Sequence, residues 1–262
     1  MTYIFAHRGS SKSAPENTMA AFRKALEEKA DGIELDVQLS KDKVPVIIHD
    51  ESLKRTTGTK GFVGEYTVEE LKRLDAGKWF SQKFKGEKIP TLEEVLIWLQ
   101  PTCLYLNIEF KNNVLPYYGM EKIVHDLVCH YGLQDRVIYS SFNHYSLKEL
   151  KKVNPRVDIA PLYSSGLYEP WKYAKSMTAE SAHPHWRTLN QAILKGFKKH
   201  GIRVRPYTVN DTKKMKWMFE NDVEAIITDT PEIARSVRAG THQSKTAKFI
   251  NTLQKINPKS LF

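Results

Sequence analysis

The sequence predicts an α/β fold in which eight parallel strands and their helices form one closed (β/α)8 TIM barrel. Two observations predict it. Short β-branched and apolar runs alternate with amphipathic helical stretches through most of the chain. These strand-like runs number eight, and eight parallel strands close a barrel of this kind. A chain of 262 residues, 41% of them hydrophobic, is long enough to fold as one such domain.

The first strand, helix and second strand are expected at residues 3–6, 18–29 and 32–37, which together form a strand-helix-strand unit. Six further strands follow, each with a plausible helix after it. They are expected at residues 104–110, 136–140, 158–162, 178–182, 202–207 and 225–228. We therefore expect a single barrel domain over residues 1–240.

The connection between the second and third strands, residues 51–101, is too long for a simple crossover. It is rich in Gly, Thr, Lys and aromatic residues and ends in a helix-like stretch from Pro90 to Leu96. Loops of this length in compact domains usually carry function, so we expect a capping insertion over one end of the barrel. Residues 241–262 are basic and mildly amphipathic, and we expect an appendage that packs on the barrel or frays from it.

The formal net charge of +10 favours association with anions, and charge alone leaves phosphate substrates, nucleic acids and anionic membranes open. Basic residues are scattered through the predicted helices without the aromatic and basic stripe of a nucleic-acid surface, so we expect no nucleic-acid partner. Charges interrupt every apolar run before membrane-spanning length, and the first residues, MTYIFAHRGS, lack the basic start and long apolar stretch of a secretion signal, so we expect no such signal. We expect a soluble cytoplasmic protein without stable membrane insertion.

The two cysteines, Cys103 and Cys129, lie far apart in apolar or helical runs. This arrangement gives neither a metal-binding spacing nor a disulfide framework. We expect both to be ordinary reduced core thiols.

The first strand ends in His7-Arg8-Gly9, and the active sites of (β/α)8 barrels are built at the carboxyl ends of the strands. His7 can move a proton near neutral pH, and the Arg8 guanidinium can hold two phosphate oxygens in a planar fork. Gly9 allows the backbone to turn close to a ligand. A surface His-Arg pair followed by a turn glycine is the competing interpretation.

Glu34 and Asp36 share one face of the second strand because side chains alternate with a period of two. Carboxylates this close repel each other unless a cation lies between them, and an all-oxygen pair suits Mg²⁺ or Ca²⁺ better than Zn²⁺. The third strand ends in Glu109 and Lys111, again on one face, where the carboxylate could complete the metal site and the ammonium could meet phosphate charge. A solvated acidic edge and strand-end salt bridges are the alternatives.

His49, followed by Asp50, comes directly after another apolar run and supplies a second imidazole. Two histidines permit separate acid and base roles. His183, Tyr207 and Asp229 end the sixth, seventh and eighth predicted strands, so we expect them on the same rim. We expect the first two of these to contact substrate.

An ordered set of motifs over residues 3–238 resembles the glycerophosphodiester phosphodiesterase family. The motifs are His7-Arg8-Gly9, Pro15-Glu16-Asn17-Thr18, Glu34-Leu35-Asp36, His49-Asp50, Arg55-Thr56-Thr57, Leu74-Asp75-Ala76-Gly77, Ile89-Pro90-Thr91-Leu92, Glu109-x-Lys111, Tyr207-Thr208-Val209-Asn210 and Thr228-Asp229-Thr230-Pro231. The ordered set is specific, and it covers nearly everything but the tail.

The resemblance implies a (β/α)8 barrel with a capping segment and one divalent cation, Ca²⁺ or Mg²⁺. The matched positions are Glu34, Asp36 and Glu109 for the metal, His7 and His49 for the general acid and base, and Arg8 and Lys111 for the phosphate. Enzymes of this family release sn-glycerol 3-phosphate and an alcohol from deacylated phospholipids. In the route we expect, one histidine deprotonates the glycerol 2-hydroxyl for attack on phosphorus, the other protonates the leaving alcohol, and a cyclic phosphate is then hydrolysed.

Tyr207 departs from the family, which usually has Trp at this position, so we expect an altered substrate preference more than lost catalysis. Two other functions fit the same residues. A related phosphodiesterase of lysophospholipase D or sphingomyelinase D type would act at a membrane surface. A non-catalytic phosphate-binding module would use the net charge, although it would not need three carboxylates and two histidines at strand ends. The released alcohol, the metal and the oligomeric state stay open.

Overall fold

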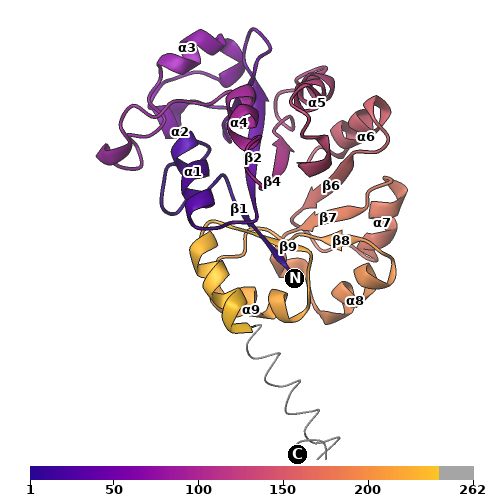
Figure 1. Cartoon of the computed structure of the whole chain (residues 1–262). Coiled ribbons are helices and arrows are strands. Elements are labelled where there is room, and N and C mark those ends of the chain that lie inside the picture. The colour runs from indigo at the N-terminus through magenta and orange to yellow at the C-terminus, as the bar shows by residue number, and fades with distance from the viewer. Residues whose placement is uncertain (242–262) are drawn as a thin grey trace, which may run out of the picture.

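The structure is a computed structural model of the chain, and it describes residues 1–241. Eight parallel strands form the ring in Figure 1, in the spatial order β8-β7-β6-β5-β4-β2-β1-β9. Their bounds are β1 (Tyr3–Ala6), β2 (Gly32–Leu39), β4 (Tyr105–Phe110), β5 (Val137–Ser141), β6 (Asp158–Tyr163), β7 (Ser181–Pro184), β8 (Arg203–Val204) and β9 (Ala225–Thr228).

The ring is nearly closed between its last two strands. The backbone N–H groups of Glu224 and Ile227 donate to the carbonyl oxygens of Val204 and Pro206 at 3.1 and 2.9 Å. Pro206 itself has no N–H group with which to extend the ladder of β8. These contacts complete a barrel of eight parallel strands with helices between them, so the predicted TIM barrel is confirmed.

Seven helices lie between successive strands of the ring, and an eighth helical stretch, residues 231–241, follows β9, so that helices surround the barrel (Figure 1). The seven are α1 (Met19–Glu27), α4 (Leu92–Leu99), α5 (Met120–His130), α6 (His144–Val153), α7 (Pro170–Ser176), α8 (Gln191–Lys199) and α9 (Thr212–Glu220). Their starts follow from local sequence: the side chain of Thr18 accepts a hydrogen bond from the N–H group of Ala21 at the start of α1. Thr91 and Glu94 form a capping box at the start of α4.

Strand β2 shows how the barrel separates apolar from polar side chains. Every residue of β2 is buried, as expected of a parallel strand covered on both faces. Ile33, Leu35 and Val37 belong to the apolar layer shared by strands and helices. The alternate residues Glu34 and Asp36 therefore face the barrel interior.

The chain between β2 and β4 contains a strand and four short helical segments in addition to α4. The strand β3 (Pro45–Ile47) pairs antiparallel with β2. The helical segments are α2 (Lys54–Thr57), η1 (Val63–Glu65), α3 (Val68–Arg73) and η2 (Gln82–Phe84). They enclose a small apolar core of their own, made of Val46, Ile48, Leu53, Val63, Leu71, Ala76 and Ile89. Helix α4, the last part of the predicted insertion, lies among the barrel helices (Figure 1).

Two sequence expectations are corrected here. Cys103 and Cys129 are free but exposed, so the prediction of core thiols is wrong. The buried positions of α5 are Met120, Val124, His125 and Val128, and Cys129 lies beyond them, near the end of the helix, where it is exposed. The sixth predicted strand is also shifted: Thr178 has a left-handed backbone (φ 58°), and β7 begins only at Ser181.

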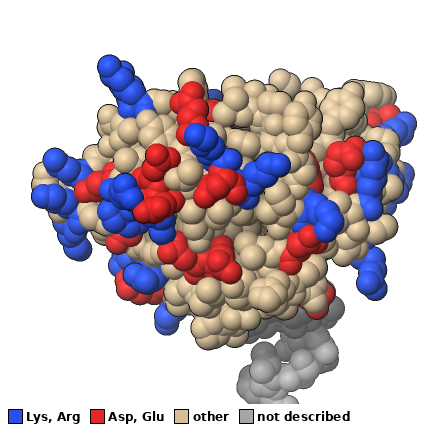
Figure 2. Space-filling model, turned by 90° about the horizontal axis from the view of Figure 1, so that it is seen from above, with Lys and Arg blue, Asp and Glu red and all other residues tan. Residues whose placement is uncertain are grey.

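The face of the molecule seen from above carries charges of both signs. Figure 2 shows Lys and Arg side chains beside Asp and Glu side chains, with broad uncharged areas between them. Within residues 1–241, no helix is long and apolar enough to cross a membrane. The expected appendage at 241–262 lies outside the described residues except for its first residue.

Candidate active site at the barrel mouth

Three carboxylates meet inside the mouth of the barrel. Glu34 and Asp36 come from β2 and Glu109 from β4, and the ladder between these strands sets Asp36 opposite Glu109. One oxygen from each lies within 4.8 Å of the others, and the three residues are only 2%, 1% and 9% exposed. Oε1 of Glu34 and Oδ1 of Asp36 are buried without a hydrogen-bond partner.

The electrostatics of this group are compatible with a cation site. Burial and the charge of Asp36 raise the pKa of Glu34 to about 8, and the same two causes raise the pKa of Glu109. Like charges held this close are unfavourable unless a proton or a cation offsets them. An all-oxygen set with two unpartnered atoms suits a hard divalent ion, so the residues present fit Ca²⁺ or Mg²⁺.

The loop between β1 and α1 fixes the orientation of these carboxylates. Nδ2 of Asn17 donates to Oδ2 of Asp36 at 2.8 Å, and the backbone N–H of Arg8 donates to Oε2 of Glu34 at 2.8 Å. Both Asn17 and Arg8 have left-handed backbones (φ 56° and 55°), and a Cβ on Gly9 would lie within 2.8 Å of Ala21. No pattern in the sequence predicts this role for Asn17, although Asn tolerates this backbone conformation better than most residues.

His7, at the end of β1, is paired with a carboxylate from the other end of the chain. Its Nδ1 lies 2.6 Å from Oδ1 of Asp229, which follows β9. Asp229 is held in turn by Nδ2 of Asn210, which donates to its Oδ2 at 2.6 Å. Nε2 of His7 lies 4.0 Å from Oε2 of Glu34. Burial lowers the pKa of His7, but Glu34 and the hydrogen bond to Asp229 outweigh it and raise that pKa.

His49 forms a second pair of the same type. Its Nδ1 lies 2.7 Å from Oδ1 of Asp50, and its Nε2 lies 3.2 Å from Nζ of Lys111. Lys111 also donates to Oε1 of Glu109 at 3.2 Å. Burial, helped by the cations Arg8 and Lys111, lowers the pKa of His49 against the pull of Asp36 and the Asp50 hydrogen bond. The two histidines therefore have pKa values shifted in opposite directions.

Arg8 lies between the carboxylates and the rim. Its Nη1 donates to Oε1 of Glu16 at 2.9 Å, and its Nε lies 3.3 Å from Oδ2 of Asp36. The pKa of Arg8 is raised because Asp36 and Glu16 outweigh burial, so the guanidinium stays charged. The mouth therefore holds two fixed cations, Arg8 and Lys111, beside the three carboxylates.

The structure does not bring His183 to the rim, so its expected position is wrong. It lies within β7, is fully buried, and its Nε2 contacts Nη1 of Arg205 at 3.4 Å. Arg205 in turn donates to Asp158, the first residue of β6, so His183 belongs to a buried polar network in the barrel interior and not to the exposed rim. Burial and Arg205 place its pKa well below the usual value, which keeps the ring neutral.

Tyr207, after β8, does lie at the mouth. Its ring packs edge-on against Phe142 and His185 at 5.9 and 5.6 Å between centroids. Its hydroxyl has no hydrogen-bond partner, and burial followed by the charge of Glu109 raises its pKa. His185, which follows the observed end of β7 by one residue, was not predicted from the sequence.

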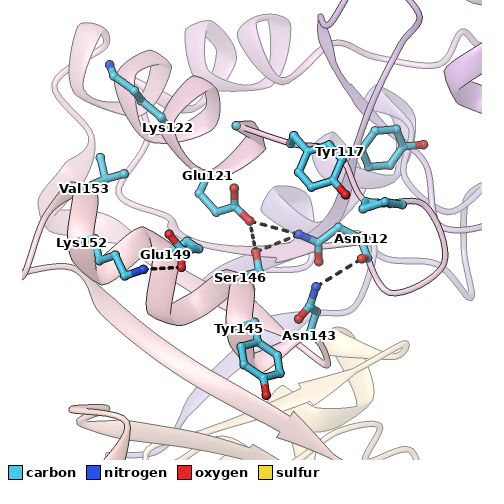
Figure 3. A pocket seen from close by; sticks show the side chains of 13 residues that line it. Asn112, Tyr117, Glu121, Lys122, Asn143, Tyr145, Ser146, Glu149, Lys152 and Val153 are labelled. Carbon is cyan, nitrogen blue, oxygen red and sulfur yellow. Dashed lines mark hydrogen bonds and ion pairs between the residues drawn. The ribbon is translucent and has the colours of Figure 1, made fainter.

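A separate cavity of about 590 Å³ lies between the starts of α5 and α6 (Figure 3). At its centre, Oε1 of Glu121 accepts hydrogen bonds from Ser146 and Asn112. Asn112 follows Lys111 directly and turns toward the helices, whereas Lys111 turns toward Glu109. The chain at the end of β4 therefore separates this cavity from the three carboxylates.

Comparison with known proteins assigns the family. The model of the glycerophosphoryl diester phosphodiesterase family matches residues 7–233. A glycerophosphodiester phosphodiesterase of Caldanaerobacter subterraneus is 47% identical over 91% of this chain and 99% of its own length. An enzyme of that name from Bacillus altitudinis is 42% identical, over 91% and 98%.

Solved structures agree with the relatives found by sequence. A glycerophosphodiester phosphodiesterase from Agrobacterium tumefaciens superposes with a TM-score of 0.80 at 32% identity, covering 90% of this chain and 100% of that one. A phosphodiesterase from Oleispira antarctica, in complex with the product sn-glycerol 3-phosphate, gives a TM-score of 0.81 at 31% identity over 90% and 96%. The chain therefore belongs to the glycerophosphoryl diester phosphodiesterase family, and it is an enzyme of that kind.

Proposed function

We propose that the protein hydrolyses glycerophosphodiesters to sn-glycerol 3-phosphate and an alcohol, with one divalent cation, Ca²⁺ or Mg²⁺, as its cofactor. The observation that carries the proposal is the buried carboxylate group, with two unpartnered oxygens, beside two His-Asp pairs. The Oleispira antarctica relative, solved with sn-glycerol 3-phosphate, supports the choice of product. The cytoplasmic location and the absence of a nucleic-acid partner stay predictions from the sequence.

Glu34, Asp36 and Glu109 would hold the cation. When bound, it would offset charge on the phosphoryl oxygens as a Lewis acid. Asn17 and the backbone N–H of Arg8 would keep Asp36 and Glu34 turned toward it, because each donates to one carboxylate oxygen and leaves the other free.

His49 serves as the general base in this proposal. Its Nδ1–H donates to Asp50 and its Nε2 faces Lys111, an ammonium that can only donate. Nε2 is therefore the unprotonated nitrogen, and the lowered pKa keeps the ring neutral at neutral pH. This nitrogen would take the proton from the glycerol 2-hydroxyl as the hydroxyl oxygen attacks phosphorus.

His7 serves as the general acid. Its raised pKa favours the protonated ring, which would donate Nδ1–H to Asp229 and offer Nε2–H to the leaving alcohol oxygen. The first step forms a cyclic phosphate and releases the alcohol. In the second step His7, now neutral, takes a proton from water as the water attacks phosphorus, and His49 returns its proton to the glycerol oxygen.

Arg8 and Lys111 would bind the phosphate, since both are charged side chains beside the carboxylates. A guanidinium can hold two phosphoryl oxygens, and an ammonium meets charge that develops in the transition state. Tyr207 would form the wall against the glycerol backbone, with its unpartnered hydroxyl free for a substrate hydroxyl.

The cyclic route predicts an intermediate that direct hydrolysis lacks. In single turnover we expect a transient cyclic glycerophosphate before sn-glycerol 3-phosphate appears; either route places one oxygen from water in the phosphate, so the cyclic species is the deciding observation. A substrate whose glycerol 2-hydroxyl is replaced by hydrogen should not be cleaved, because it lacks the nucleophile. Cleavage of the deoxy substrate at the normal rate, with no cyclic species detected, would establish direct attack by water.

The substrate class is tested by competition. We expect glycerophosphodiesters such as glycerophosphocholine to be turned over in preference to lysophosphatidylcholine, with sn-glycerol 3-phosphate measured as the product and both Ca²⁺ and Mg²⁺ tried. A strong preference for the lysolipid would reject this proposal in favour of a lysophospholipase D type of activity. Turnover of neither class by the metal-loaded protein would favour a phosphate-binding module.

A further inference from the structure

We infer that Arg55 is a positioning residue, which holds Asp50 and Glu16 so that they orient His49 and Arg8 in the mouth. Arg55 lies in α2, outside the barrel strands. The inference rests on the proposed function, because it assigns to Arg55 the alignment of two groups that act in that reaction. Arg55 itself need not touch the substrate for this role.

The guanidinium of Arg55 is bound on two edges. Nη1 and Nη2 donate to the two carboxylate oxygens of Glu16 at 2.9 and 2.7 Å. Nε and Nη2 donate to the two carboxylate oxygens of Asp50 at 2.6 and 3.1 Å. Paired, parallel hydrogen bonds of this type fix the relative orientation of both groups, which a single exposed ion pair does not do.

The edge of the Arg55 guanidinium that faces Asp50 affects the orientation of His49. Oδ1 of Asp50 is shared between Nη2 of Arg55 and Nδ1 of His49. The hydrogen bonds from Arg55 are the largest cause that lowers the pKa of Asp50, to about 2, so the carboxylate stays an acceptor. An ionised Asp50 in this place accepts a hydrogen bond from Nδ1–H of His49. It thereby favours the tautomer in which Nε2 is unprotonated.

The edge of the Arg55 guanidinium that faces Glu16 affects the position of Arg8. Oε1 of Glu16 accepts from Nη2 of Arg55 and also from Nη1 of Arg8, at 2.7 and 2.9 Å. The Glu16 side chain is 13% exposed and therefore has little freedom to find another position. Without Arg55, Glu16 would be held by Arg8 alone, so Glu16 and the Arg8 guanidinium could shift together from the position that Arg8 now has beside Asp36.

The position of Arg55 is itself fixed from the chain between β3 and β4. Its guanidinium lies over the ring of Trp79, 5.7 Å from the ring centroid, and Nε1 of Trp79 donates to the carbonyl oxygen of Ala76. Leu53 and Thr56, on either side, are buried. The segment between β3 and β4 thus influences the proposed reaction through Arg55, whose side chain holds Asp50 and Glu16 in place.

The experiment compares Arg55→Gln with Arg73→Gln, a matched control. Arg73 lies in α3 of the same segment. Within residues 1–241, the ion pair of its guanidinium is with Glu69 alone. We expect Arg55→Gln to lower kcat/KM by about 10- to 100-fold, as loss of a group that orients a catalytic side chain does. Arg73→Gln should keep wild-type kcat/KM, and both variants should melt cooperatively.

Two double-variant cycles separate the effect of Arg55 on Asp50 from its effect on Glu16. Combined with Asp50→Asn, Arg55→Gln should add little further loss in kcat, because both act through His49. Combined with Glu16→Gln, it should add little further weakening of inhibition by sn-glycerol 3-phosphate, because both act through Arg8. Guanidinium ion should restore part of the kcat of Arg55→Ala, since a free guanidinium can bridge the same carboxylates.

A readout without substrate keeps this inference distinct from the proposed function. In ¹⁵N NMR spectra of the histidine rings, His49 should be the Nδ1–H tautomer in the wild type and a mixture in Arg55→Gln. An unchanged His49 tautomer, together with fully additive double variants, would overturn the inference even in an active enzyme. If the metal-loaded wild type released no sn-glycerol 3-phosphate, the proposed function would fail, and the tautomer would still decide whether Arg55 orients His49.

Discussion

Replacing Glu34 with Gln is expected to lower kcat/KM for glycerophosphocholine by about 10³-fold while making the metal-free protein more stable. The loss follows because Gln offers no charge to the cation. The gain follows because Glu34 is buried beside Asp36 and Glu109 and must take up a proton when the metal-free protein folds near neutral pH, whereas Gln is already neutral. Opposite effects on activity and stability are characteristic of a site built to hold an ion.

The raised pKa of Glu34 also predicts how the stability of the metal-free protein changes with pH. The pKa of Glu34 is raised from 4.5 to about 8 in the folded protein, so folding favours its protonated form. The metal-free protein should therefore be most stable below about pH 4.5 as far as this group is concerned, and should lose that contribution as pH rises toward about 8. Glu34→Gln should remove this fall, and so should bound Ca²⁺ or Mg²⁺.

Thermal melting with a chelator, from about pH 5 to about pH 8, measures the effect. Glu69→Gln is the matched control, because Glu69 is an exposed residue of α3 paired with Arg73. Its melting curve should follow that of the wild type at every pH. Equal pH dependence in the wild type and Glu34→Gln would show that the three carboxylates do not compete for a shared proton or cation.

Replacing His49 or His7 with Ala should lower kcat/KM for glycerophosphocholine by about 10²- to 10⁴-fold, and a better leaving group should rescue only one of them. His7 is the proposed donor to the leaving alcohol, so His7→Ala should recover most of its rate with a p-nitrophenyl ester, whose leaving group needs no proton. His49→Ala should stay slow on that ester, because the glycerol hydroxyl still has to lose its proton.

The pH profile of kcat/KM separates the histidines further. The acid limb should report His49, whose pKa is lowered, and the alkaline limb should report His7, whose pKa is raised. With the p-nitrophenyl ester the alkaline limb should disappear. His200→Ala serves as the control, since His200 stacks on Trp171 between α7 and α8 and should leave both limbs unchanged. Rescue of His49→Ala instead of His7→Ala would exchange the two assignments.

The sequence predicted the carboxylate group because the geometry that makes it is regular. Alternation along β2 sets Glu34 and Asp36 on one face, and pairing with β4 brings Glu109 opposite Asp36. The end of the first strand placed His7 correctly for the same reason. In the strands of a barrel, side-chain alternation and the position of the strand end are therefore enough to predict which residues face the site.

The network around these residues could not be predicted, because it depends on contacts between distant parts of the chain. Asp229 reaches His7 only because the ring closes β9 against β1. Arg55 meets Glu16 across 39 positions, through a loop whose path no local pattern fixes. His183 was misplaced because its strand begins later than the apolar pattern suggests, which moves the side chain from the rim to the interior.

The most direct test of the account is a metal titration of chelator-treated protein with glycerophosphocholine as substrate and sn-glycerol 3-phosphate as the measured product. We predict no turnover without metal, full recovery with Ca²⁺ or Mg²⁺, and binding of one ion per chain that Glu34→Gln abolishes. Undiminished turnover in the presence of chelator, with no ion bound, would contradict the assignment of Glu34, Asp36 and Glu109 to a metal site.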